Sequence, residues 1–463
     1  MFRIQSQRGR LFLVAAAVAA GIAGACAKKA AIVEPPPIVP GVTHIEGNRV
    51  LWDTDRTARG CVRYGFTAGD YTHMAYPNAA SRADRAFTQS HTVALLDLTP
   101  GRKVYYQAVS EPQTGAASYT HPDSFIATTG PATNLLFSTM IHIGFGDSHL
   151  LTMPTSHKRI LIDAGTQPAE ASVETYLAAH GVTSLDVMMA THTHLDHMGG
   201  EVGQTSGGAV NDGVIISFPA PLVLDSPAKS GESQGSGAYQ NFLASLSATG
   251  RIPTVVRRFD TSGSQAALQW DPAVFIRCLN SGTPPNYSPV GGGTDTNNES
   301  MVLHFTYGDV DFVIGGDAED FAEENMVGAF PPQQLEVEFA KIHHHGLQDA
   351  SSQSWIQALQ PRVGFIPNTA YSWDPPSSLP GAIAESSSRL QAVGAHIYVV
   401  DEALPLGKPR TSAQYNTTFV TDGLSYEVRI ERATQPAPVK AVSDCGPHGG
   451  VPAERHPQAL GAH

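Results

Sequence analysis

Three histidines and one aspartate fall within six residues of one short segment. The segment reads Thr-His-Thr-His-Leu-Asp-His-Met-Gly-Gly and contains His192, His194, Asp196 and His197. Residues two apart on an extended segment point to the same side, so His192 and His194 can bind one metal ion. The chain then turns toward a helix, where Asp196 and His197 can face a second ion. The spacing therefore predicts a metal site.

Two later segments add further metal-binding side chains at the ends of predicted strands. Residues 313–317 form a strand that ends on Asp317, and a carboxylate at that place can bridge two metal ions. Residues 339–346 form a strand that runs into three histidines, one of which closes the second metal site. The three candidates are His343, His344 and His345.

The elements that must position these residues follow α/β order. Residues 137–144 and 160–165 are strand-like, and the second of these strands ends in Asp163 and a glycine. Residues 173–180 have helical spacing with Gly181 as the cap, and residues 185–190 form a buried strand. Strand, helix and strand in this order are typical of an α/β fold. Two Gly- and Ser-rich stretches, 228–239 and 280–299, are predicted to be long loops near the metals.

The combination of H-x-H-x-D-H, a strand-end Gly-Asp and a late strand-end His resembles the metallo-β-lactamase superfamily. The phrases HIGFGDSHLLTMP, NNESMVLHFTYGDVDFVIGGDAED and AKIHHHG are similar to the metallo-hydrolase domain of ComEC-type DNA-uptake competence proteins. The resemblance covers about residues 134 to 425. It implies an α/β fold, an αββα sandwich with the metals at one sheet edge, and two divalent ions, Zn²⁺ or alternatively Mn²⁺.

The resemblance also implies a role for each matching residue. His192 and His194 would hold one ion, and Asp163 would orient a ligand histidine. The other ion would be held by Asp196, His197 and His344, with Asp317 as the bridge. Alignment on the following glycine selects His344, and His345 beside it stays an alternative. A hydroxide shared by the ions would attack the substrate, so the predicted catalytic residues are Asp196, Asp317 and Lys341. Lys341 is either a solvated strand-edge residue or a cation near a substrate phosphate.

The sequence departs from the family pattern in the middle of the chain. No histidine occurs between Gly200 and His304, where β-lactamases and glyoxalase-type members place a metal ligand. His304, Asn297 or Asn298 could complete the first metal site, and the sequence does not choose among them. The resemblance to ComEC-type proteins implies phosphodiester substrates, and the missing histidine makes a lactamase of the same fold the less favoured alternative, beside a thioesterase.

The first 26 residues have the features of an export signal. Arg3, Arg8 and Arg10 precede an apolar run, and small residues lead to Cys26 as in the lipobox of bacterial lipoproteins. We expect an exported protein, placed in the outer membrane by a lipid on Cys26 or free in the periplasm or at the cell surface. Residues 27–37 are predicted to be a linker, and residues 432–463 a disordered tail.

Residues 38–128 are predicted to form a separate all-β domain. An early Trp, the strand VRYG, the corner LTPG and the strand YYQAVS resemble fibronectin type III domains, as found at the N-terminus of purple acid phosphatases. The segment contains no catalytic cluster, so we interpret it as a spacer or adhesion module. The hydrolase domain is then expected at residues 134–431.

Composition limits the classes of partner. The 463 residues have a formal net charge of −13, which argues against tight non-specific binding of nucleic acid. The composition still permits a small-molecule or polymeric phosphodiester substrate that is bound through metal ions. The predicted function is therefore an exported metal-dependent phosphodiesterase acting on nucleic acid or a phosphorylated cell-surface polymer. The alternatives are a non-catalytic adhesion lipoprotein and a lactamase or thioesterase.

Overall fold

The computed structural model describes residues 37–432, apart from several short gaps. The gaps are residues 145, 203–204, 207–208, 211–212, 228–229, 286–295, 369–382 and 401–414. The predicted signal segment with Cys26, nearly all of the predicted linker and nearly all of the predicted tail therefore lie outside the described residues.

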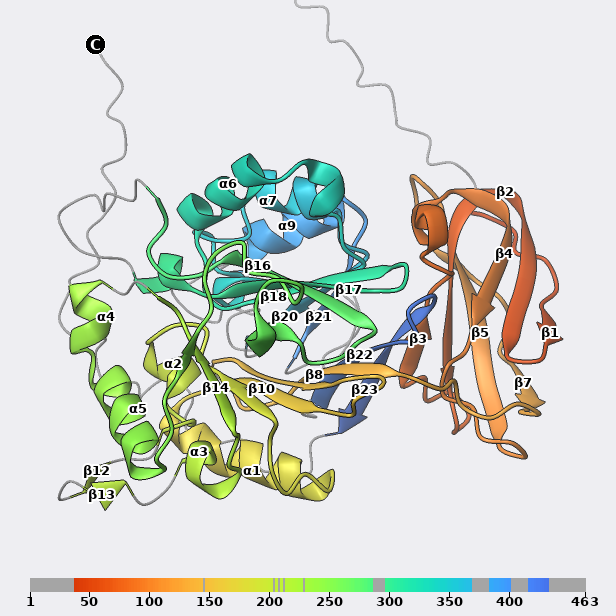
Figure 1. Cartoon of the computed structure of the whole chain (residues 1–463). Helices are drawn as coiled ribbons and strands as arrows, with labels where there is room; N and C mark the ends of the chain where they lie inside the picture. Colours follow the sequence, from red (N-terminus) through yellow and green to blue (C-terminus); the bar gives the residue numbers. More distant parts are fainter. Residues whose placement is uncertain are drawn as a thin grey trace, which may run out of the picture. The chain divides into compact units, whose positions relative to one another are not determined.

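The first sheet of residues 134–432 has a mixed strand order (Figure 1). Its strands β10, β11, β14 and β15 are parallel, and β9, β8, β22 and β23 continue it in antiparallel fashion. Their bounds are β15 Thr254–Val255, β14 Leu222–Asp225, β11 Val187–Met189, β10 Arg159–Ala164, β9 Ser148–Thr152, β8 Leu136–Met140, β22 Tyr415–Thr421 and β23 Tyr426–Arg432.

The second sheet runs in the order of the sequence, from β16 to β21. Strands β16, β17 and β18 form an antiparallel meander. Strand β18 also begins a parallel group that continues with β19, β20 and β21. Their bounds are β16 Val274–Asn280, β17 Val302–Tyr307, β18 Val310–Gly315, β19 Phe339–Lys341, β20 Val363–Ile366 and β21 His396–Val399.

The two sheets pack face to face, and both are also covered by helices. Ile160 and Ile162 of β10 point into the core between the sheets, whereas Leu161 points to a second core under the helices. In β18, Phe312 and Ile314 point between the sheets and Val313 points to the helices on the other side. Because successive strand residues face opposite sides, burial of both faces produces the continuous apolar runs seen in the sequence.

The helices on the two outer faces complete the four layers (Figure 1). The first sheet is covered by α1 Glu170–Ala179, α3 Val214–Ser217 and α5 Gly237–Ala248. The second is covered by α6 Asp320–Ala329, α7 Gln353–Leu359 and α9 Ala384–Ala392. The predicted αββα sandwich is confirmed. None of the helices among the described residues is long and apolar enough to cross a membrane.

Short elements connect these layers and carry several polar residues. They are η2 Gln167–Ala169, α2 Leu195–Met198, β12 Thr205–Ser206, β13 Ala209–Val210, α4 Gly231–Gly235, η3 Ala266–Leu268, η4 Thr296–Glu299, η5 Pro332–Gln334 and η6 His344–Gly346. Helix α4 lies inside one of the stretches predicted to be a loop. Its cap is Ser230, whose hydroxyl accepts a hydrogen bond from the Ser233 backbone N–H.

Residues 37–127 form strands and one 3₁₀ helix. The elements are β1 His44–Glu46, β2 Arg49–Gly65, β3 His73–Ala75, η1 Ala80–Arg85, β4 Thr88–Ala94, β5 Lys103–Glu111, β6 Ser118–Tyr119 and β7 Asp123–Ile126. Trp52, Tyr64 and Tyr106 share a core of their own in this segment. Strand β3 pairs with β2 and also with β23, so hydrogen bonding continues into the first sheet of residues 134–432. That this segment is a fibronectin type III-like domain, and that its boundaries are those expected from the sequence, stay predictions.

Candidate metal centre

Strand ends from both sheets bring the polar residues to one edge. Asp317 follows β18, the late histidines follow β19, and the H-x-H-x-D-H segment follows β11. Strands β10 and β11 are parallel, as are β18 and β19, so within each sheet these carboxyl ends lie at one edge. Asp147 precedes β9, which runs antiparallel to β10, and therefore reaches the same edge. Gly316 permits the close approach, because a Cβ there would lie 2.3 Å from Thr191 Oγ1.

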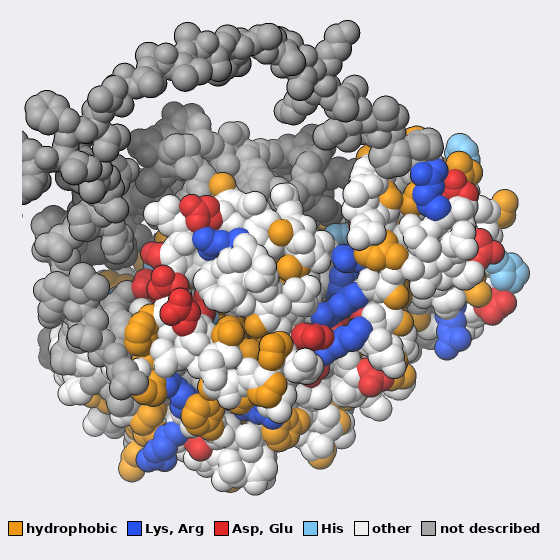
Figure 2. All heavy atoms as spheres, turned by 90° about the horizontal axis from the view of Figure 1, so that it is seen from above, with side chains coloured by type: hydrophobic (Ala, Val, Ile, Leu, Met, Phe, Trp, Pro, Cys, Tyr) orange, Lys and Arg blue, Asp and Glu red, His pale blue; other side chains and the backbone are white. Residues whose placement is uncertain are grey.

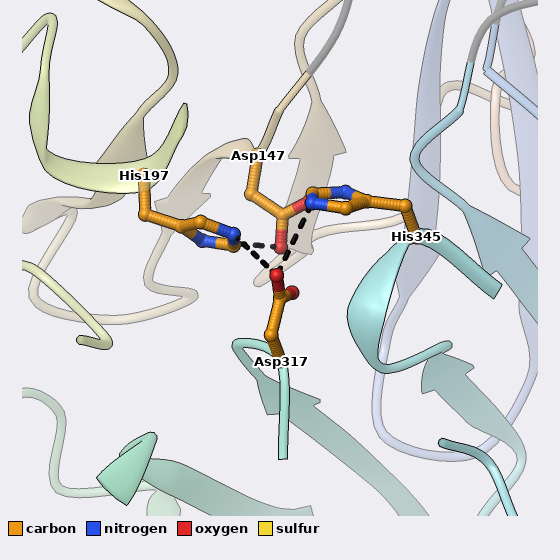
Figure 3. Close-up of side chains that lie close together, drawn as sticks. All are labelled: Asp147, His197, Asp317 and His345. Carbon is orange, nitrogen blue, oxygen red and sulfur yellow. Dashed lines mark hydrogen bonds and ion pairs between the residues drawn. The ribbon is translucent and has the colours of Figure 1, made fainter. Parts of the chain in front are cut away.

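Four buried side chains converge at this edge. Asp147, His197, Asp317 and His345 each offer one ligand atom, and these atoms lie within 4.8 Å of one another (Figure 3). His197 Nε2 is 2.9 Å from Asp317 Oδ2, and His345 Nε2 is 3.2 Å from the same oxygen. Asp317 Oδ2 is therefore the point on which the two imidazoles converge. We call these four residues the central cluster.

A carboxylate on the neighbouring strand holds the His197 ring. Asp163 Oδ2 is 2.8 Å from His197 Nδ1, and Asp163 Oδ1 accepts a hydrogen bond of 2.7 Å from the Thr191 backbone N–H. Nδ1 therefore faces the carboxylate, and Nε2 is directed into the central cluster. Asp163 has the left-handed φ of 58°, which is uncommon for a residue other than glycine. The contact is the one that the family resemblance assigns to Asp163, whose role stays a prediction.

The structure brings His345, and not His344, to the central cluster. His345 Nε2 lies 3.1 Å from Asp196 Oδ2, and its Nδ1 lies 3.2 Å from Asp147 Oδ1. His344 is turned away and its Nδ1 lies 2.8 Å from Asp349 Oδ1, in a partly exposed position. Both histidines have positive φ, so the chain makes a left-handed turn here. Alignment of the sequence on the following glycine does not reveal this turn and therefore selects His344, the histidine that is turned away from the central cluster.

The third candidate, His343, points into the helical layer. Its Nδ1 is 2.8 Å from Glu323 Oε1, and its ring stacks on Trp355 with the centroids 5.5 Å apart. Both partners belong to the helices that cover the second sheet. His343 is therefore a buried packing residue in this structure and lies on the opposite side of the strand end from the central cluster.

The two histidines of the H-x-H pair lie beside the central cluster. The ring of His192 is 4.2 Å from that of His197 and 4.7 Å from that of His194, measured between centroids. His192 Nε2 has no hydrogen-bond partner in the described part of the chain. His194 Nε2 contacts the hydroxyl of Thr296 on η4. The pair therefore offers nitrogen ligands next to the central cluster, and η4 lies over it.

Lys341 and Asp147 form a buried ion pair at the base of the central cluster. Lys341 Nζ contacts the Asp147 carboxylate, donates a hydrogen bond of 2.7 Å to Gly316 O and lies 3.6 Å from Asp317 Oδ1. The Lys341 side chain is only 1% exposed, so its amine faces the carboxylates and not the solvent. The sequence pattern alone assigns no role to Asp147. The Gly-Phe-Gly-Asp loop before a strand was its only signal.

Burial and nearby charges shift the pKa values of three of these imidazoles, and not all in the same direction. Burial alone lowers the pKa of His197, but the carboxylates of Asp317, Asp147 and Asp163 raise it well above the usual value. Burial likewise lowers the pKa of His345, but the carboxylates of Asp317 and Asp147 raise it well above the usual value. Burial, together with the adjacent His197 and His194, lowers the pKa of His192 well below the usual value. His192 is therefore neutral, as a metal-binding imidazole must be.

This set of donors fits divalent metal ions. Imidazole nitrogens and carboxylate oxygens in one buried group are typical ligands of zinc, and a carboxylate-rich set also suits manganese. Two observations indicate unused binding capacity: the partnerless Nε2 of His192 and the Oδ1 of Asp317, which accepts no hydrogen bond from the described residues. The raised pKa values of His197 and His345 mean that both imidazoles take up a proton beside the carboxylates. A bound cation would supply this positive charge in place of the two protons.

The residues proposed to complete the first metal site have other contacts. Asn297 Nδ2 donates to Glu319 Oε1 at 2.9 Å and lies 3.4 Å from His344 Nε2. Asn298 Nδ2 is 3.2 Å from Glu319 Oε2. Both amides therefore hold Glu319, the residue before α6.

His304 lies in the middle of β17, away from the strand ends. It pairs with Arg277 on one side and Val313 on the other. Burial lowers the pKa of His304 to about 4, and the charged groups that affect it are Asp311, Arg277 and Arg82. None of its contacts among the described residues involves the central cluster.

No family model matches the chain. ComE operon protein 3 of Bacillus subtilis is 26% identical over 243 residues, which are 49% of this chain and 27% of that protein. The chain thus spans well under two thirds of the length of this relative.

Solved structures with the same type of fold are also similar to the chain. The metallo-β-lactamase fold protein YhfI from Bacillus subtilis has a TM-score of 0.33 and 10% identity, covering 58% of this chain and 98% of that one. The metallo-β-lactamase SMB-1 has a TM-score of 0.29 and 13% identity, with coverages of 56% and 93%. These similarities are low, and the description of the fold rests on the sheet order and packing of this chain itself.

Proposed function

We propose that the chain is an exported metal-dependent hydrolase that cleaves phosphodiesters in nucleic acid or a phosphorylated cell-surface polymer. The observation that carries the proposal is the convergence of two imidazole nitrogens on Asp317 Oδ2 at a sheet edge, 2.9 and 3.2 Å away. The resemblance to ComEC-type proteins, together with the similarity to ComE operon protein 3, supports phosphodiesters over other substrates.

Two divalent ions, Zn²⁺ or Mn²⁺, are the cofactors that we propose. His192 and His194 would hold one ion. His197, His345 and Asp196 would hold the other, and Asp317 would contact both. Such ions supply Lewis acidity and an activated water when bound. His345 here takes the place that alignment gave to His344, because His345 is the one that reaches Asp317.

The remaining residues of the site orient and balance these ligands. Asp163 fixes the ring of His197 through Nδ1, so Nε2 stays directed at the metal position. Lys341 neutralises part of the charge of Asp147 and Asp317 and keeps both carboxylates in place. Its burial supports this positioning role over direct contact with a substrate phosphate. A nucleophilic Ser or Cys is not required, and both described cysteines, Cys61 and Cys278, are buried.

The surface charge is compatible with a substrate that is recognised mainly at the metals. On the face seen in Figure 2, Lys and Arg side chains lie beside Asp and Glu side chains. The net charge of −13 likewise provides little general attraction for a polyanion. We therefore propose that affinity for the phosphodiester comes from the metal ions, with no tight non-specific binding of nucleic acid.

A paired substrate assay tests the reaction class. Wild-type protein loaded with Zn²⁺ or Mn²⁺ is expected to hydrolyse bis-p-nitrophenyl phosphate and to leave nitrocefin intact. The Asp317→Ala variant serves as the inactive control for contaminating phosphodiesterases. Turnover of nitrocefin alone would instead place the chain with lactam hydrolases. Saturation with metal but no turnover of either compound would favour the non-catalytic adhesion protein.

We also propose that a lipid on Cys26 places the protein in the outer membrane, or that cleavage there releases it. Labelling of expressing cells with a radioactive fatty acid separates the two forms, with Cys26→Ser as the control. Label in the wild type and none in Cys26→Ser supports the anchor. A processed but unlabelled wild-type protein supports simple secretion, and an unprocessed cytosolic protein contradicts export.

A further inference from the structure

A second group of metal-binding side chains lies far from the central cluster in sequence and in fold. Cys61 of β2, Glu111 at the end of β5 and His396 at the start of β21 each offer one ligand atom, all within 4.8 Å of one another. We propose that these three residues bind a Zn²⁺-type divalent cation that links the N-terminal strands to the second hydrolase sheet. The proposal does not depend on the proposed hydrolase activity.

The ligand atoms converge from three different strands. His396 Nε2 contacts Glu111 Oε1 directly, and Cys61 Sγ lies 4.0 Å from that oxygen. Strands β2 and β5 pair with each other, whereas β21 belongs to the second sheet. Thiolate, imidazole and carboxylate are the side-chain groups that bind zinc in proteins. This group of three residues contains one of each.

Neighbouring residues hold the two polar ligands from behind. The Tyr76 hydroxyl lies 2.8 Å from His396 Nδ1, the ring nitrogen that faces away from the group. Arg362 Nη2 lies 3.0 Å from Glu111 Oε2, the carboxylate oxygen that faces away. The outer atom of each ligand is thus occupied, and the inner atom faces the proposed ion. Supporting contacts of this kind orient the ligands in established metal sites.

The charges of the group suit a divalent cation. Burial raises the pKa of the Cys61 thiol well above its usual value, so the thiol is neutral without a metal. Binding would release the thiol proton to solvent and move the imidazole proton of His396 from Nε2 to Nδ1, where it can be donated to Tyr76. One thiolate and one carboxylate then balance the ion, while Arg362 keeps its contact with Oε2.

The proposed site is reachable from one side. Cys61 is fully buried, but the side chains of Glu111 and His396 are 22% and 16% exposed. An ion could enter past these two residues, and a water molecule could occupy the fourth coordination position. Because β21 is an edge strand of the second sheet, the ion would connect that edge with the N-terminal strands.

Cobalt titration provides a readout that is independent of activity. Co²⁺ bound by a thiolate gives a charge-transfer band in the near ultraviolet, whereas the His and Asp ligands of the central cluster do not. We expect the full-length protein to show this band with the intensity of one thiolate-bound Co²⁺ per chain, in addition to the Co²⁺ that the central cluster takes up without a band, and we expect addition of Zn²⁺ to abolish it. Failure to observe the band at saturating Co²⁺ overturns the proposal.

Single cysteine variants identify the ligand. Cys61→Ser is expected to abolish the band, while Cys26→Ser, Cys278→Ser and Cys445→Ser keep it. The matched control is Cys278→Ser, because Cys278 is the other buried thiol among the described residues. If circular dichroism shows that Cys61→Ser is misfolded, Glu111→Gln provides the second test. We expect its affinity for Co²⁺ to be lowered at least about tenfold. A band that persists in Cys61→Ser, or unchanged affinity in Glu111→Gln, contradicts the assignment.

Discussion

At the scale of single residues, the choice among three consecutive histidines decides the composition of the metal site. His345 reaches Asp317 and Asp196, His344 pairs with the half-exposed Asp349, and His343 is buried against the helices. The sequence identified the segment but not the ligand. The selection depends on left-handed backbone at His344 and His345, which is set by the tertiary contacts of the strand end and leaves no local sequence pattern.

Substitution of the two neighbouring histidines tests this selection. His345→Ala removes a nitrogen from the central cluster and is expected to lower metal affinity and phosphodiesterase rate by more than the roughly 10- to 100-fold typical of a supporting contact. His344→Ala loses only a partly exposed contact and is expected to keep the metal. Metal content after dialysis against a weak chelator measures both. The opposite ranking would return the ligand role to His344.

Lys341 gives a second prediction at this scale, because it is a buried cation among carboxylates. Lys341→Met keeps most of the unbranched side chain but leaves Asp147 and Asp317 without their amine partner. Removing one partner of a buried ion pair costs about 3–5 kcal/mol of unfolding free energy. We expect this loss in the metal-free protein, measured by urea denaturation, and a partial recovery on adding Zn²⁺. Unchanged metal-free stability would mean that the amine does not balance these carboxylates.

At the scale of secondary-structure elements, strands were easier to predict than loops. The strands expected at 160–165 and 185–190 appear as β10 and β11, and the helix expected at 173–180 appears as α1. Their apolar periodicity is a local property of the sequence. The stretch 228–239 was expected to be a loop but contains α4 and the start of α5, because serine caps and buried contacts outweigh its Gly and Ser content.

Glu299 is the residue that ties these connecting elements together. Its carboxylate accepts hydrogen bonds of 2.6 Å from the Ser230 backbone N–H, 2.6 Å from the Ser233 hydroxyl and 3.0 Å from the Thr283 hydroxyl. Glu299 also belongs to η4, whose Thr296 contacts His194. One buried acid therefore connects the cap of α4 with the element that lies over the H-x-H pair.

Loss of this carboxylate should loosen the connecting elements. Glu299→Ala leaves buried donors without an acceptor, which costs about 1–3 kcal/mol. We expect faster limited proteolysis around α4 together with the lower unfolding free energy. Glu46→Ala is the control, since the Glu46 side chain is 61% exposed. Equal proteolysis of the two variants would show that Glu299 does not hold α4 in place.

At the scale of the whole molecule, the N-terminal strands contact the four-layer region of residues 134–432 through buried polar groups. Tyr64 donates a hydrogen bond of 2.8 Å to Glu427, and Tyr426 donates one of 2.6 Å to Asp84. The fully buried carboxylate of Glu338 contacts Arg82 and Arg85 of η1. The sequence suggested a spacer, because its patterns describe each segment alone. Contacts between segments 250 or more residues apart cannot be read from such patterns.

Removal of the N-terminal strands should therefore destabilise the four-layer region of residues 134–432. A variant lacking residues 1–127 removes Tyr64 from Glu427, the arginines of η1 from Glu338, and β3 from its pairing with β23. We expect poor solubility, or a lower midpoint of thermal unfolding, compared with the chain that lacks residues 1–36 alone. A truncated protein with an unchanged midpoint and activity would support an independent spacer.

The most direct test of the account compares the metal content of Asp317→Ala with that of His304→Ala. Asp317 Oδ2 is the point on which His197 and His345 converge, whereas His304 lies mid-strand without a contact to the central cluster among the described residues. Elemental analysis of each purified variant, beside the phosphodiesterase rate, gives the result. We predict that Asp317→Ala loses metal and activity together and that His304→Ala keeps both. Loss of metal in His304→Ala as complete as in Asp317→Ala would contradict the proposed site, would make His304 the missing mid-chain ligand, and would remove the argument that disfavours a lactam substrate.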